Sequence, residues 1–173
     1  IHFQFFFESI KLTSIANATF LGTLAPIFTI CLEKFWLKRN IQKNMIFALL
    51  IIFTGSFIIV GDQFDVTSNY TKGNLYALIC SLWIALAFMI SENVRKESET
   101  VAFSKTLFTS AAITLMMISV YTSEPLIGYS NQDYLGLFLL GLIPTVFGHS
   151  VFYFALRYVQ PTVVAAFPLG EPV

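Results

Sequence analysis

The stretch "LTSIANATFLGTLAPIFTICL", Leu12 to Leu32, contains no charged residue. Four further stretches are almost equally apolar: Asn44–Gly61, Gly73–Ser91, Thr106–Ser123 and Leu135–Leu156. Each is about 18 residues or longer, close to the roughly 20 that a helix needs to cross a hydrocarbon core of about 30 Å. A soluble protein can bury one such helix, whereas five in succession indicate a membrane protein.

The composition points to the same class. Charged residues make up 12% of the chain, about half of what soluble domains carry, while 56% of residues are hydrophobic and 16% aromatic. The net charge is zero, so nothing indicates a nucleic-acid partner. Helices are the expected spanning form because each one satisfies its own backbone hydrogen bonds in lipid. We therefore predict an all-α, polytopic helix bundle in the cell (inner) membrane, with the lipid bilayer as a partner.

The chain divides into seven apolar segments: Ile1–Thr13, Ser14–Leu37, Met45–Gly61, Gly73–Ser91, Ala102–Ser119, Tyr134–Tyr158 and Thr162–Val173. The links between them, such as "EKFWLKRNIQK" and "ENVRKESET", carry turn-forming and charged residues. If the links alternate between two sides, one side collects these basic residues: Lys34, Lys38, Arg39, Lys43, Arg95, Lys96, Lys105 and Arg157. The other side has only Lys11 and Lys72, so the first side is predicted to face the cytoplasm. Glu33, next to Lys34, is interpreted as part of a solvated cytoplasmic cluster.

An internal repeat emerges when the end of the chain is placed over its beginning with an offset of 146 positions. Lys11 then falls on Arg157, and Pro26 falls on Pro172. The alternative is chance, since apolar sequences resemble each other easily. Two copies that are separated by an odd number of crossings have opposite orientations, so the pattern predicts an inverted repeat.

The repeat also predicts a domain organisation. Residues 1–61 would be the C-terminal part of a first five-helix repeat, 62–72 an outer loop, and 73–173 an incomplete second repeat. Completing both copies gives a ten-helix protein of about 300 residues, truncated at both ends in this chain.

Four stretches resemble one known family. "SIANATFLGTLAPIFTICLEKFWLKR" resembles the fourth helix of EamA-type proteins in the drug/metabolite transporter superfamily, and "IFALLIIFTGSFIIVG" resembles the fifth. "GNLYALICSLWIALAFMISENVRK" is similar to the opening of the family's second half, and "LGLIPTVFGHSVFYFALRYVQPTVVAAFPLGEPV" to helices eight and nine. The resemblance implies transport of small metabolites or toxic compounds by alternating access. We expect efflux, and leave open proton coupling and a homodimer.

Glu171 is the first candidate for the substrate pathway, in "VVAAFPLGEPV". An ionised carboxylate inside a spanning helix is costly unless it faces a partner or a watery cavity. Pro172 removes a helical donor and Gly170 loosens the backbone, so a local break is predicted there. The alternative is a carboxylate that pairs with a basic side chain for packing.

Three further polar side chains are candidates for the same pathway. His149 in "FGHSVFYF" could carry protons, because imidazole is the side chain suited to proton exchange near neutral pH, or it could bond to a neighbouring helix. Asn17 could bond to a helix or a substrate, and we favour the helix. Tyr153 could line an aromatic cavity, although packing is the simpler interpretation.

Two residues near His149 are predicted to shape its helix. Pro144 leaves a carbonyl without its helical donor, and Gly148 lies one turn further on. A kink at this point could be a gate or a packing feature.

Two other function classes are alternatives to a carrier. An intramembrane zinc enzyme needs clustered ligands, but His2 and His149 are far apart, and the two cysteines have no ligand-like spacing. No motif for hydrolytic or phosphate chemistry is present, so we predict a protein that is not an enzyme and has no metal or cofactor. A channel or a non-transporting scaffold is the other alternative.

Overall fold

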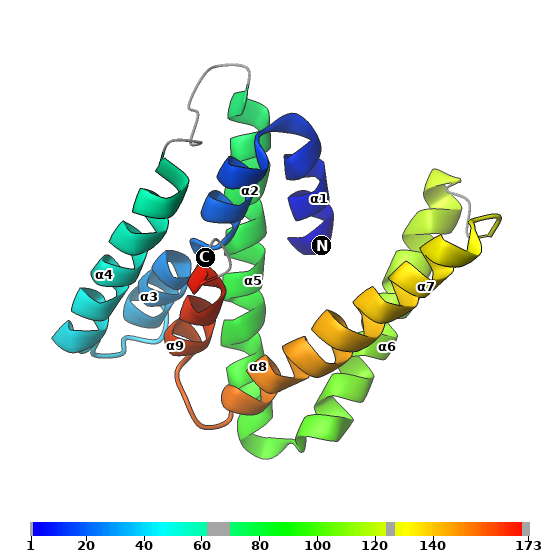
Figure 1. The fold of residues 1–173 in the computed structure, drawn as a ribbon. Helices are drawn as coiled ribbons and strands as arrows, with labels where there is room; N and C mark the ends of the chain where they lie inside the picture. Colours follow the sequence, from blue (N-terminus) through cyan, green and yellow to red (C-terminus); the bar gives the residue numbers. More distant parts are fainter. Residues whose placement is uncertain (1, 62–69, 124–126, 171–173) are drawn as a thin grey trace. The chain divides into compact units, whose positions relative to one another are not determined.

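The computed structural model describes residues 2–61, 70–123 and 127–170, and all regular structure in these ranges is helical (Figure 1). The predicted all-α fold is therefore confirmed. The chain forms two compact units, which are described separately below. Unit 1 comprises residues 1–91 and 159–173, and unit 2 comprises residues 92–158.

Unit 1 contains helices from both ends of the chain: α1 (His2–Leu12), α2 (Ile15–Gly22), α3 (Ala25–Phe35), α4 (Lys43–Val60), most of α5 (Thr71–Glu97), α9 (Pro161–Ala166) and the 3-10 turn η4 (Phe167–Gly170). The C-terminal helix α9 packs against α3, and η4 packs against α4. Figure 1 shows α9, in red, beside α3, in blue. Helices far apart in sequence therefore form one core.

The segment Ser14–Leu37, predicted as one helix, contains two helices. Ser14 caps α2, and its hydroxyl accepts a hydrogen bond from the Asn17 backbone N–H at 3.0 Å. The helix ends at Gly22, and α3 begins at Ala25 with a proline in its first turn. The break occurs here because proline is tolerated at the start of a helix but not in its interior.

Helix α5 is longer than predicted. The link "ENVRKESET" was expected to begin after Ser91, but the helix continues to Glu97. Glu92 and Lys96 form an i, i+4 ion pair at 3.4 Å, and Lys96 with its neighbour Arg95 lies in the last turn, where the helix dipole favours cations. The predicted loop was wrong because charged residues without glycine or proline extend a helix readily.

Unit 2 contains the end of α5, then α6 (Thr100–Thr122), α7 (Asn131–Leu140), the π-helical segment η3 (Gly141–His149) and α8 (Ser150–Ala155). Helix α6 ends at Thr122, and the next residue, Ser123, caps it with a left-handed backbone (φ 57°). A reciprocal pair of bonds between Ser130 and Asp133 caps the start of α7. From Asn131 to Ala155 the chain is continuously helical, as predicted, and α8 packs against α6.

Among the described residues, four helical stretches are long and apolar enough to cross a membrane: Ile15–Phe35, Thr71–Glu97, Thr100–Thr122 and Asn131–Ala155. A shorter apolar helix covers Lys43–Ile58. Four of the five long apolar stretches of the sequence therefore coincide with spanning candidates, and the fifth, Asn44–Gly61, coincides with the shorter helix.

Candidate functional site

The break between α2 and α3 leaves backbone carbonyls without their helical partners. Pro26 has no N–H, and Thr23 and Leu24 leave regular helical geometry. The Leu24 N–H donates to Leu21 O at 3.3 Å, and the hydroxyl of Ser81, on α5, donates to the same carbonyl. A neighbouring helix thus stabilises unwound backbone inside an apolar segment.

A second break follows α9. Pro168 has no N–H to offer to the Val164 carbonyl, and the Phe167 N–H bonds to that carbonyl instead, which tightens the chain into η4. The Ser56 hydroxyl, on α4, donates to Leu169 O at 2.9 Å. This break is therefore also stabilised by a serine from another helix.

The two breaks lie at equivalent places in the proposed repeat. With the offset of 146, Thr23 and Leu24 fall on Leu169 and Gly170. Gly170 is the last described residue of η4. Glu171, predicted to lie on the pathway, and Pro172, predicted to break the helix there, lie outside the described residues.

Asn17 lies in a buried polar cluster that joins α1, α2 and α5. Its Nδ2 donates to Asn74 Oδ1 at 3.0 Å, and Thr13 Oγ1 donates to the same oxygen at 2.7 Å. Gly73 makes this approach possible, because a Cβ there would lie 2.6 Å from the Leu12 carbonyl carbon. In this structure Asn17 bonds to a neighbouring helix.

His149 and Pro144 lie at the two ends of one wide helical turn in unit 2. The proline leaves the Leu140 carbonyl without its usual donor, and Thr145 Oγ1 donates to that carbonyl at 3.2 Å. His149 Nδ1 lies 2.9 Å from Pro144 O, and Nδ1 must carry the proton because a carbonyl can only accept. Gly148, in the same turn, is partly exposed.

Tyr153 is buried in unit 2, and its ring contacts Phe103 at 5.3 Å between centroids. Its backbone carbonyl accepts a hydrogen bond from Arg95 Nε at 2.9 Å. The terminal nitrogens of Arg95 donate to Ser98 O and Thr100 Oγ1. From the sequence, Arg95 was predicted only as a charged residue of a loop. In the structure its side chain is fully buried, between the C-terminal end of α5, the start of α6 and α8.

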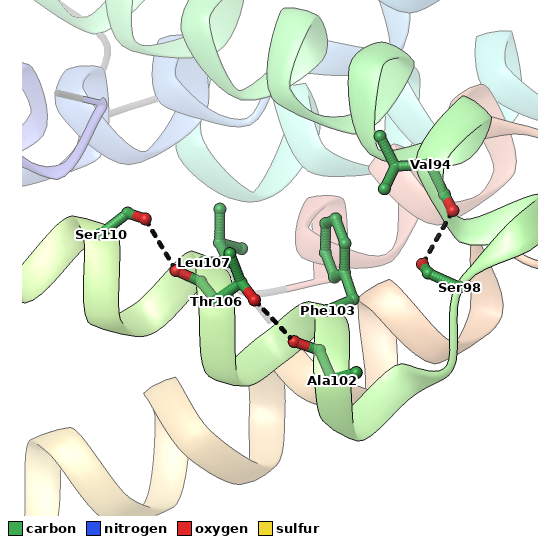
Figure 2. A pocket seen from close by; sticks show the side chains of 7 residues that line it. All are labelled: Val94, Ser98, Ala102, Phe103, Thr106, Leu107 and Ser110. Atoms are coloured by element: carbon green, nitrogen blue, oxygen red, sulfur yellow. Dashed lines mark hydrogen bonds between the residues drawn. The ribbon is translucent and has the colours of Figure 1, made fainter.

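A cavity of about 360 Å³ lies along α5 and α6 in unit 2 (Figure 2). Its lining residues are Val94, Ser98, Ala102, Phe103, Thr106, Leu107 and Ser110. The hydroxyls of Thr106 and Ser110 donate to carbonyls of their own helix at 3.0 and 2.8 Å. The cavity therefore offers a mainly apolar surface.

The interpretation of Glu33 as a solvated residue was wrong. Its side chain is fully buried between α3 and α9, and its Oε2 accepts a hydrogen bond from Thr162 Oγ1 at 2.8 Å. Its Oε1 lies 3.5 Å from Arg39 Nη1. By contrast, Glu8 pairs with Lys11 at 2.7 Å on an exposed face of α1.

Residues 1–61 and 71–173 match the EamA-like transporter family. The chain belongs to this family. The resemblance noted in the sequence is therefore confirmed. Together with the apolar helices, family membership identifies a multi-pass membrane protein and a transporter family rather than an enzyme family.

Two curated relatives come from Bacillus subtilis (strain 168). The uncharacterized transporter YyaM is 23% identical over 69% of this chain and 40% of its own length. The uncharacterized transporter YxxF is 19% identical over 97% of this chain and 54% of its own length. This EamA-family chain thus spans about half the length of the curated relatives it matches.

A solved structure described only as "Crystal structure of protein" has the same fold. Its TM-score is 0.77 at 17% identity, and the match covers 99% of this chain and 59% of the other. At this identity the likeness shows the fold alone.

The candidate residues of this EamA-family chain are divided between the two units. Unit 1 holds Asn17 and Gly170, whereas unit 2 holds His149 and Tyr153 together with the predicted kink. Sequence reasoning missed Ser56 and Ser81, which bond to the broken backbone. The prolines Pro26 and Pro168 gave the available signal, because each one marks a place where the regular helix is interrupted, although the serines bond to other carbonyls nearby.

Proposed function

We propose that this chain forms much of a carrier that moves small metabolites or toxic compounds across the membrane by alternating access. The observation that carries the proposal is the pair of broken helices in unit 1. One break separates α2 from α3, the other follows α9, and α3 packs against α9. Family membership supports the same function.

Broken helices suit a carrier because they present backbone groups where a continuous helix presents none. Secondary transporters commonly bind solutes and ions beside discontinuous helices at the interface of two repeats. In this chain, Ser81 and Ser56 each bond to one carbonyl near a break. These serines hold the unwound backbone in place, and the remaining polar groups there can bind a solute.

Glu171 gives the proposed pathway its charge preference. It follows Gly170, the last residue of η4, and precedes Pro172. A carboxylate in an apolar segment favours a cationic solute group, such as an amine, or a proton. We therefore include organic amines among the proposed substrates, with efflux as the direction.

The test is counterflow in liposomes that contain the full-length protein. Radiolabelled candidate amines should accumulate transiently against excess internal unlabelled compound, because a carrier exchanges solutes and a channel does not. Glu171→Gln should reduce this exchange at least about tenfold, as expected when one charged contact is lost. Glu8→Gln, in an exposed ion pair, is the matched control and should retain exchange. Unchanged exchange in Glu171→Gln would reject the role of that carboxylate.

Proton coupling is assigned to His149 in the same proposal. His149 lies within the apolar helical stretch of unit 2, and imidazole is the side chain suited to taking up and releasing protons near neutral pH. In inside-out vesicles, an imposed pH gradient should drive substrate uptake by the wild type, and this response should be lost in His149→Gln. His2→Gln is the control. A normal pH response in His149→Gln would reject the coupling role.

A further inference from the structure

Glu33 occupies an unfavourable place for a carboxylate. It lies in the last turn of α3, where the helix dipole disfavours negative charge, and its side chain is fully buried. A buried carboxylate requires strong partners. One partner comes from a different helix: Thr162 Oγ1, in the first turn of α9, donates to Glu33 Oε2 at 2.8 Å. The bond therefore joins α3 to α9 across 129 positions of sequence.

A second partner reaches Glu33 from the turn that follows α3. Lys38 has a left-handed backbone (φ 52°), and the Arg39 N–H donates to the Glu33 carbonyl at 2.9 Å. This closed turn brings Arg39 Nη1 within 3.5 Å of Glu33 Oε1. The Arg39 side chain is 24% exposed. Because the turn is local to α3, Arg39 stays beside Glu33 wherever α9 lies.

We propose that Thr162 and Glu33 form a latch that holds the start of α9 against α3 and releases once in each transport cycle. Arg39 is the partner that keeps the carboxylate paired when the latch is open. The inference rests on the proposed function in one respect, that α3 and α9 separate during transport. The positive-inside pattern assigns this end of the helices to the cytoplasm.

The two contacts differ in a way that suits a latch. The Thr162 bond is short, buried and formed between helices, so it is lost when the helices separate. The Arg39 contact is longer, half-buried and local, so it persists. Release then costs one charge-assisted hydrogen bond. Because Arg39 stays beside Glu33, the carboxylate is never buried without a partner, which would be far more costly.

The experiment measures the separation of α3 and α9 directly in the full-length protein. Spin labels at the exposed positions Lys34 and Val163, introduced after replacement of the native cysteines, report the distance between the two helices by pulsed electron resonance in lipid nanodiscs. Thr162→Val should raise the ratio of open to closed molecules about tenfold, the effect of one hydrogen bond to a charged group. Thr162→Ser keeps the hydroxyl and should match the wild type.

Arg39→Ala should change the ratio of open to closed molecules in the opposite direction. Because Arg39 stabilises the carboxylate most when the latch is open, its removal should lower the open fraction. A wild-type ratio in Thr162→Val, or the same ratio in Thr162→Ser and Thr162→Val, would overturn the latch. A raised open fraction in Arg39→Ala would overturn the role of Arg39. If Thr162→Val does not accumulate in the membrane, Thr162→Ala replaces it and should raise the ratio, because it also removes the hydroxyl donor. An unchanged ratio in Thr162→Ala would overturn the latch in the same way.

Distances and transport can fail separately. If counterflow persists while the distance between α3 and α9 is unchanged in Thr162→Val, the latch is rejected and the transport function is not. Distances that respond while no variant shows counterflow would reject the transport function and leave the contact between α3 and α9 as assigned.

Discussion

Some hydroxyl groups of unit 1 bond between helices, whereas two hydroxyl groups along α6 in unit 2 bond within their own helix. In unit 1, Ser81, Ser56 and Thr162 each donate to a group on another helix. In unit 2, Thr106 and Ser110 donate to carbonyls one turn back in their own helix, α6. The residue types are the same, but their partners are not.

The difference follows from how closely each helix is packed. The apolar window of Thr71–Glu97 is 39% buried within this chain, whereas that of Thr100–Thr122 is 6% buried. A hydroxyl beside another helix can bond across the interface, and a hydroxyl without such a neighbour bonds to its own backbone. Polar residues in an apolar helix therefore specify its packing only where a neighbouring helix supplies an acceptor.

In unit 2, Arg95 is a polar side chain that does bond between helices, and its removal should have the largest effect on stability. Arg95→Ala deletes the side chain that donates to Tyr153 O, Ser98 O and Thr100 Oγ1. We expect a loss of about 3 to 5 kcal/mol in the free energy of unfolding, because three acceptors lose a charged donor. Thermal unfolding of the detergent-solubilised protein would measure it.

The neighbouring lysine provides the control for that experiment. Lys96 is 51% exposed, so Lys96→Ala should cost about 0 to 1 kcal/mol. Equal losses in the two variants would show that unit 2, like α6 itself, is not held together by polar contacts between its helices.

Gly73→Ala should have the next largest effect, in unit 1. The new Cβ would lie 2.6 Å from the Leu12 carbonyl carbon and 2.7 Å from Thr13 Cβ, both of which are too close. The start of α5 must move away from the α1–α2 turn, at a cost of about 1 to 3 kcal/mol. Gly55→Ala, on α4, meets no atom within 4 Å and is the control. Thermal unfolding that ranks Gly55→Ala below Gly73→Ala would contradict the close approach.

The smallest effect tests the comparison of hydroxyls directly. Ser81→Ala removes a donor from the broken backbone at Leu21 and should cost about 1 kcal/mol. Ser110→Ala removes only a bond to its own helix and should change the free energy of unfolding by less than about 0.5 kcal/mol. The two variants, unfolded side by side under the same conditions, should differ in that order; the reverse order would refute the distinction between the units.

Local patterns predicted the helices well, because apolar runs and prolines act over short distances. Pro144 signalled a carbonyl without its donor, and this feature is present. The break before Pro26 was not predicted, although proline near the start of α3 is consistent with it. Partners across the fold could not be read in this way. Nothing near Glu33 in sequence indicates that Thr162 bonds to it, and nothing in "ENVRKESET" separates the buried Arg95 from the exposed Lys96.

The sequence alone determined that this protein is an all-helical membrane protein, because the number of apolar residues in succession and the cost of unpaired backbone in lipid leave few other structures. Its resemblance to a transporter family came from four separate stretches of sequence. Only the tertiary structure decided which charges are buried and which hydroxyls bond between helices. Burial depends on which helices meet, and α3 meets α9 across more than a hundred residues of intervening chain.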